Sequence, residues 1–108
     1  MTSFLEYVVY DLFGDGEPVT WRAMMGGYIL YYEGKPFAIV DDETLWLKGN
    51  KDTKEWYVEK GSKQFEYNKK DKKTGESKSY KMNYFSVPEE IQENREVFKE
   101  WVEVACSL

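Results

Sequence analysis

Few side chains in this 108-residue sequence have the types and spacing that catalysis or metal binding requires. Histidine is absent, which removes the commonest general base and a common metal ligand. The one cysteine, Cys106, has no histidine to activate it, so we expect a small side chain on the last turn of a helix rather than a nucleophile. Most of the 20 acidic residues fall in turns or on one polar helix face, where contact with solvent accounts for them. We therefore expect a protein that is not an enzyme, with no catalytic residue, no metal site and no cofactor.

The glycine pair Gly26-Gly27 offers one alternative, a site for an anion. No third glycine follows at the spacing of a dinucleotide fingerprint, and a strand rather than a helix comes next, so the pair itself indicates a bend or bulge at the entry to a sheet. Arg22, just before it, could pair with a nearby carboxylate or contact an anion. The candidate anion contact therefore consists of Arg22, Gly26 and Gly27, and a small-ligand or anion-binding domain is the alternative function.

The charge distribution argues against strong direct binding of nucleic acid. The net charge is −5, whereas a free-standing DNA-binding protein normally carries a basic surface for phosphate contacts. Between Lys63 and Lys81, seven lysines accompany three acidic residues, a local net charge of +4, which leaves −9 on the rest of the chain. The cluster from Lys69 to Lys73 could touch phosphates, but a solvated hairpin tip is the favoured interpretation.

The sequence also indicates where the protein acts. The N-terminus lacks the basic and apolar regions of a secretory signal, and no apolar run reaches the roughly 20 residues that a membrane helix needs. A single cysteine cannot form an internal disulfide, which fits a reducing compartment. We expect a cytoplasmic protein with no membrane partner.

Hydrophobic periodicity and turn residues predict a single domain over residues 1–108. The expected elements, in chain order, are a helix over 4–12, strands over 19–24, 28–32, 36–40 and 44–48, a helix over 52–60, strands over 64–69 and 77–85, and a helix over 94–105. Asp52 and Ser86 are expected to cap helices, and Trp56 to anchor the middle helix in the core. The fold class is α+β with two layers, an antiparallel sheet (a three-stranded meander plus a hairpin) packed with three helices, in the order α-β-β-β-β-α-β-β-α.

The strands of the meander carry apolar side chains on both faces. We expect one face to form the core, made of Ile29, Tyr31, Phe37, Ile39, Leu45 and Leu47. The other face would then consist of Tyr28, Leu30, Tyr32, Val40 and Trp46. Because monomers rarely expose an apolar patch of that kind, this face predicts a homodimer or a protein complex with Trp46 near its centre. The alternative is that a helix or the 64–85 hairpin covers the face within one chain.

Several sequence blocks resemble the N-terminal domain of the TfoX/Sxy family of bacterial competence regulators. The blocks are Arg22-Ala-Met-Met-Gly-Gly-Tyr-Ile-Leu-Tyr, Gly34-Lys-Pro-Phe-Ala, Leu45-Trp-Leu-Lys48, Met82-Asn-Tyr-Phe-Ser-Val-Pro-Glu89 and a last helix that contains Trp101. The similarity extends from about Phe4 to Ala105. It departs from the family pattern at Met25, where phenylalanine is frequent, and at Ile29, where glycine is.

The resemblance implies an α+β domain with an antiparallel sheet flanked by helices. It also implies a link to transcription of DNA-uptake genes, in which longer members of the family, which carry a second domain, act alongside the cyclic-AMP receptor protein. The favoured hypothesis is a non-enzymatic regulatory or protein-interaction domain, a transcription co-regulator linked to competence genes.

Overall fold

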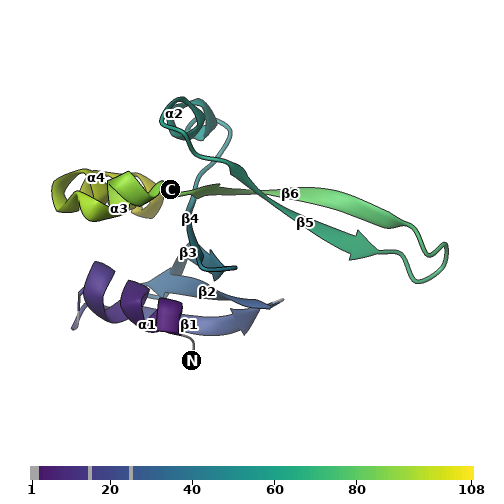
Figure 1. The fold of residues 1–108 in the computed structure, drawn as a ribbon, viewed down its shortest axis with the longest axis horizontal. Coiled ribbons are helices and arrows are strands. Elements are labelled where there is room, and N and C mark those ends of the chain that lie inside the picture. Colours follow the sequence, from purple (N-terminus) through teal and green to yellow (C-terminus); the bar gives the residue numbers. More distant parts are fainter. Residues whose placement is uncertain (1–2, 15, 25) are drawn as a thin grey trace.

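One antiparallel sheet of six strands organises the computed structural model, which describes residues 3–14, 16–24 and 26–108 (Figure 1). The strands are β1 (Val19–Met24), β2 (Gly27–Tyr32), β3 (Lys35–Asp41), β4 (Thr44–Lys48), β5 (Gln64–Lys70) and β6 (Ser77–Ser86), and they lie in the order β1-β2-β3-β4-β6-β5. Pairing of β6 with β4 joins the meander and the hairpin into a continuous sheet. The expected α+β class and the strand positions are confirmed.

The helices differ from expectation mainly at their ends. A four-residue α1 (Ser3–Glu6) continues as the π-helical η1 (Tyr7–Leu12), and the middle helix is α2 (Lys54–Glu59). The expected last helix, over 94–105, is α4 (Arg95–Cys106), and a separate short helix, α3 (Glu89–Glu93), precedes it. Asn94 between them has an extended backbone (φ −104°, ψ 99°), and its Oδ1 accepts a hydrogen bond from the Val97 amide at 3.3 Å, so α4 is capped where it begins.

Two expected caps are wrong. The amides of Asp52 and Thr53 both donate to Oδ1 of Asn50, at 2.8 and 2.9 Å, so Asn50 rather than Asp52 organises the entry to α2. Ser86 belongs to β6, and its hydroxyl oxygen accepts from the Lys63 amide at 2.9 Å. Both errors have one cause, because short polar side chains can serve several neighbouring backbone groups and local sequence does not select among them.

The turns of the meander lie where the sequence predicts them. Glu33 (φ 51°) and Gly34 (φ 84°) both have left-handed backbones, as do Asp42 (φ 50°) and Glu43 (φ 54°) in the next turn. Two consecutive positive φ angles are typical of the type I′ turns that match the twist of paired strands. The expected tight turn at Glu33-Gly34 is thereby confirmed.

The main core lies between the helices and one face of the sheet. At its centre the Tyr57 ring of α2 stacks on Phe85 of β6, with ring centroids 4.9 Å apart, and contacts Trp101 of α4 at 5.5 Å. All three side chains are almost completely buried. Trp56, the expected anchor of α2, is only partly buried and packs on Trp101 from the side, so Tyr57 holds the deeper position.

A bulge in the sheet overturns the expected division of its faces. Leu30 pairs with Ala38 whereas Tyr31 pairs with Pro36, so Phe37 is an extra residue in β3. Phe37 therefore joins Ala38 and the main core instead of following Ile39. The expected core face is wrong as a set, since Phe37, Leu45 and Leu47 lie in the main core and Ile29 and Ile39 pack in a second cluster.

Candidate functional site

The predicted interaction surface does not exist as one face. Leu30 and Val40 are 0% and 4% exposed in the main core, and Tyr28 and Tyr32 pack against the same core. Trp46 alone of the five lies on the opposite face. The alternation in β2 was predicted well, but the choice of which face meets the helices was wrong, because residues on both faces are equally apolar.

A second apolar cluster occupies the face of the sheet opposite the helices, and we call it the strand-face cluster. All six strands contribute to it, and within the part of the chain that the structure describes none of its members comes from a helix. Its buried side chains are Ile39, Phe65 and Tyr84, and its partly buried side chains are Met24, Ile29, Trp46, Tyr67 and Met82. Of the five residues of the predicted interaction surface, this cluster contains Trp46.

Trp46 packs inside this cluster rather than at the centre of an exposed patch. Its ring meets Phe65 of the hairpin edge to face, with centroids 5.0 Å apart. The indole Nε1 is buried and has no hydrogen-bond partner among the described residues. The hairpin thus covers Trp46 within the chain, which is the alternative that the sequence had left open.

The outer part of the β5–β6 hairpin, residues 68–81, extends away from the rest of the sheet, and we call it the arm (Figure 1). All of its residues are exposed. At its root Tyr67 and Tyr80 stack across the two strands at 5.5 Å, and the Lys69–Lys78 pair follows on the same face. The arm carries six lysines and two acidic residues, so the expected solvated, basic hairpin tip lies on a projecting element.

The candidate anion contact is a β-hairpin rather than a bend at the entry to the sheet. Arg22 is exposed in β1 opposite Ile29, and Gly27 is buried in β2 opposite Met24. Gly26 in the turn has a φ of 84°, and Met25 lies outside the described residues. A Cβ on Gly27 would collide with the carbonyl oxygen of Val40, so this glycine permits the close approach of β3. The backbone accounts for both glycines, and anion binding by Arg22 stays a prediction.

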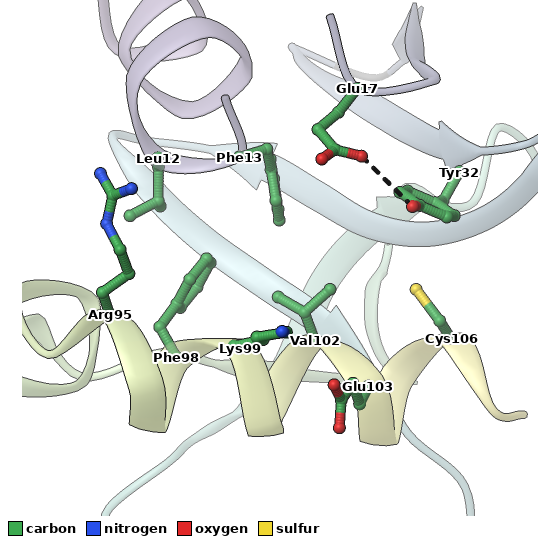
Figure 2. A pocket seen from close by; sticks show the side chains of 10 residues that line it. All are labelled: Leu12, Phe13, Glu17, Tyr32, Arg95, Phe98, Lys99, Val102, Glu103 and Cys106. Carbon is green, nitrogen blue, oxygen red and sulfur yellow. Dashed lines mark hydrogen bonds between the residues drawn. The ribbon is translucent and has the colours of Figure 1, made fainter. Parts of the chain in front are cut away.

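A cavity that the sequence did not predict lies between α4 and the end of η1, and we call it the α4 pocket (Figure 2). Its volume is about 350 Å³. Apolar side chains from both sides form its wall, namely Leu12, Phe13, Phe98 and Val102. The rings of Phe13 and Phe98 lie 5.6 Å apart, and Phe13 also contacts Phe37 of β3 at 5.3 Å.

Polar groups surround the opening of the α4 pocket. Arg95, Lys99 and Glu103 follow one another at intervals of one helical turn along α4. On the opposite side the Tyr32 hydroxyl donates to Glu17 Oε2 at 3.3 Å, as Figure 2 shows. The negative charge of Glu17 raises the pKa of Tyr32, so this phenol stays protonated and keeps donating.

Cys106 also lines the α4 pocket, from the last turn of α4. Partial desolvation and, to a lesser extent, the nearby charge of Glu33 raise the pKa of its thiol, although the residue is exposed. A raised pKa lowers the thiolate fraction at neutral pH, which is the opposite of nucleophile activation. The sequence placed Cys106 correctly on the last helical turn, but its position at a cavity depends on η1 and β2, which are distant in sequence.

The sequence did contain one sign of the α4 pocket. Phe98 and Val102 flank Val97, Trp101 and Ala105 on the apolar stripe of α4, and both line the cavity. The second wall of the cavity could not be inferred, because it needs the position of η1 relative to α4.

Comparison with known proteins gives one result for family and one for individual proteins. The family model described as the TfoX N-terminal domain matches residues 11–107. A search of proteins with curated descriptions found no significant match.

None of the helices built by the described residues has the length and apolarity needed to cross a membrane. No group of three or more His, Cys, Asp or Glu side chains within the described ranges is placed to hold a metal ion.

Proposed function

The chain belongs to the TfoX N-terminal domain family, which is associated with competence regulation, and from this premise we propose that it is a non-enzymatic regulatory domain. In this proposal it acts in the bacterial cytoplasm as a co-regulator of competence-gene transcription, and it works by contact with protein rather than by catalysis. The absence of histidine from the sequence and the raised pKa of Cys106 both support a non-catalytic role.

The observation that carries the proposal is the strand-face cluster. Among the residues that the structure describes, helices pack on one face of the sheet only, whereas the other face presents partly exposed apolar side chains such as Met24, Ile29 and Met82. Beside them Tyr80 is 42% exposed at the root of the arm. Methionine and aromatic side chains are enriched at protein interfaces, where they supply contact area.

The charges favour a second copy of this chain as the partner that binds the strand face. The arm has a net charge of +4, and the remainder of the same chain has −9. In a two-fold dimer each basic arm would meet the acidic remainder of the other copy, so the complementary charges would be used twice. The arm projects from the fold, which leaves it free to reach a partner (Figure 1).

A pair of matched variants tests the proposal. Tyr80→Lys alters the strand face, and Tyr10→Lys alters a tyrosine of η1 that is equally exposed, at 45%, and also contacts one aromatic ring, that of Trp21. We expect light scattering to show that the wild type is a dimer and that its affinity falls at high salt. The dimer affinity of Tyr80→Lys should be at least tenfold lower than that of the wild type, and the affinity of Tyr10→Lys should be unchanged. A monomeric wild type, or a Tyr80→Lys dimer of unchanged affinity, would contradict the proposed interface.

The regulatory part of the proposal needs a cellular measurement. In the bacterium that carries this gene, Tyr80→Lys should lower the transcripts of DNA-uptake genes whereas Tyr10→Lys should leave them at the wild-type level, with equal amounts of both variant proteins present. Transcripts that do not change when the gene is deleted would show that the domain has no such role.

A further inference from the structure

The α4 pocket is separate from the strand face, and its lining is suited to a ligand. We infer that it binds a small amphipathic monocarboxylate, with the carboxylate at Arg95 and Lys99 and the apolar part against the Phe13–Phe98 pair. The inference does not depend on the proposed protein contact, since no residue of the pocket belongs to the strand-face cluster.

The size and wall of the pocket set the class of ligand. At about 350 Å³ it lies at the small end of the roughly 300–1,000 Å³ that ligand sites occupy. Leu12, Phe13, Phe98 and Val102 provide an apolar wall from two elements that already pack against the core, so the wall is preformed. A ring or a short aliphatic chain fits such a wall, and burial of its apolar surface would favour binding.

The charges at the opening set the polarity of the ligand. Arg95 and Lys99 are four residues apart on α4, so both lie on the same side of the helix, and both side chains line the pocket (Figure 2). A carboxylate can accept a charge-assisted hydrogen bond from either group. Glu103 follows Lys99 in the less favourable order for a helical ion pair, so this glutamate attracts the lysine only weakly.

Two carboxylates in the lining explain why the ligand should carry one negative charge rather than two. Glu17 lies across the pocket and Glu103 lies one helical turn beyond Lys99, and both would repel a second anionic group. Glu17 already accepts the hydrogen bond from Tyr32, so an apolar end of the ligand can approach without leaving that carboxylate unpartnered.

The position of Cys106 provides a direct measurement. It is the only cysteine of the chain, it is exposed, and it lines the pocket. A bound ligand should therefore slow alkylation of Cys106 by N-ethylmaleimide. Phenylacetate is the probe, and phenylacetamide and phenethylamine are its neutral and cationic counterparts of similar size.

We expect saturable protection of Cys106 by phenylacetate and at least tenfold weaker protection by either counterpart. Arg95→Gln combined with Lys99→Gln should weaken phenylacetate at least tenfold, whereas the control Lys54→Gln, on the exposed side of α2, should not. Equal protection by the three probes, preference for the amine, lack of protection, or unchanged affinity in the double variant would each overturn the inference. A thermal midpoint for each variant confirms that the fold is intact, and Val102→Trp, which fills the cavity, should abolish protection even where the charges remain.

Discussion

Replacement of Gly27 by alanine tests how the glycine pair shapes the sheet. A Cβ at this position would overlap the carbonyl oxygen of Val40 and would lie 3.2 Å from Asp41 Cβ and 3.3 Å from Asp41 Cα. These atoms belong to β3, which pairs with β2 on one side and β4 on the other, so they cannot move without disturbing two ladders. The reason is space and not backbone conformation, since the positive φ belongs to Gly26.

The size of the expected loss of stability follows from two opposing contributions. Overpacking a well-ordered site costs roughly 1–3 kcal/mol, and replacing glycine returns about 0.4–1 kcal/mol by restricting the unfolded chain. We therefore expect the free energy of unfolding to fall by about 1–2 kcal/mol for Gly27→Ala, and by more for Gly27→Val because its branched side chain is larger and stiffer. For a small domain that loses about 2 kcal/mol of stability per molar urea, the middle of the usual range, the midpoint should fall by about 0.5–1 M.

The assay is urea denaturation followed by tryptophan fluorescence, with a matched pair of asparagine variants. Gly34 has a φ of 84°, and a side chain added there would meet nothing within 4 Å of its Cβ. Asparagine also tolerates a left-handed backbone. Gly34→Asn should thus lose much less stability than Gly27→Asn. A wild-type midpoint for Gly27→Ala, or equal losses for the two asparagine variants, would refute the argument from β3.

Three further predictions concern other parts of the fold. Asn94→Ala removes the cap of α4 and should cost about 0.5–1 kcal/mol, seen as a lower thermal midpoint, whereas the exposed Asn68→Ala should not change it. Burial raises the pKa of Tyr57, whose hydroxyl donates to the Lys48 carbonyl at 3.0 Å. Above about pH 10 the unfolded chain loses this proton while the folded chain keeps it, so the free energy of unfolding should fall as the pH rises. Urea midpoints measured from about pH 9 to 11 should show this fall, and it should be less steep in Tyr57→Phe. The domain alone should bind DNA weakly and without sequence preference, as fluorescence anisotropy at physiological salt can show, and a sub-micromolar affinity for one sequence would contradict this. Any weak binding should disappear when glutamine replaces four lysines of the arm, namely Lys69, Lys70, Lys72 and Lys73.

Local sequence was enough to place the strands. The bounds of β1 and β4 are those expected. Those of β2, β5 and β6 differ from expectation by one residue at one end, and those of β3 by one residue at each end. Glycines, a proline and acidic pairs mark the turns, and each acts on the backbone of its own neighbours. The starts of the helices were harder, because α3 precedes α4 as a separate helix and Asn50 takes the capping role expected of Asp52.

The faces of the sheet and the candidate sites required the tertiary structure. Phe37 shows why, because a single extra residue in β3 moves it to the other face, and only the pairing of β3 with β2 reveals the bulge. The same holds for Trp46, since its strand and its alternation were evident while its cover, Phe65, comes from a hairpin 19 residues further along the chain.

The sequence by itself determined the elements, the turns, the uneven charge and the lack of histidine, because these depend on residue type and on spacing within a few positions. Only the tertiary structure decided which face the helices cover, that the arm projects, and that Phe13 and Phe98 form one wall of a cavity. Each of these depends on side chains far apart in the chain, and strands with apolar residues on both faces can pack either way until the whole core is assembled.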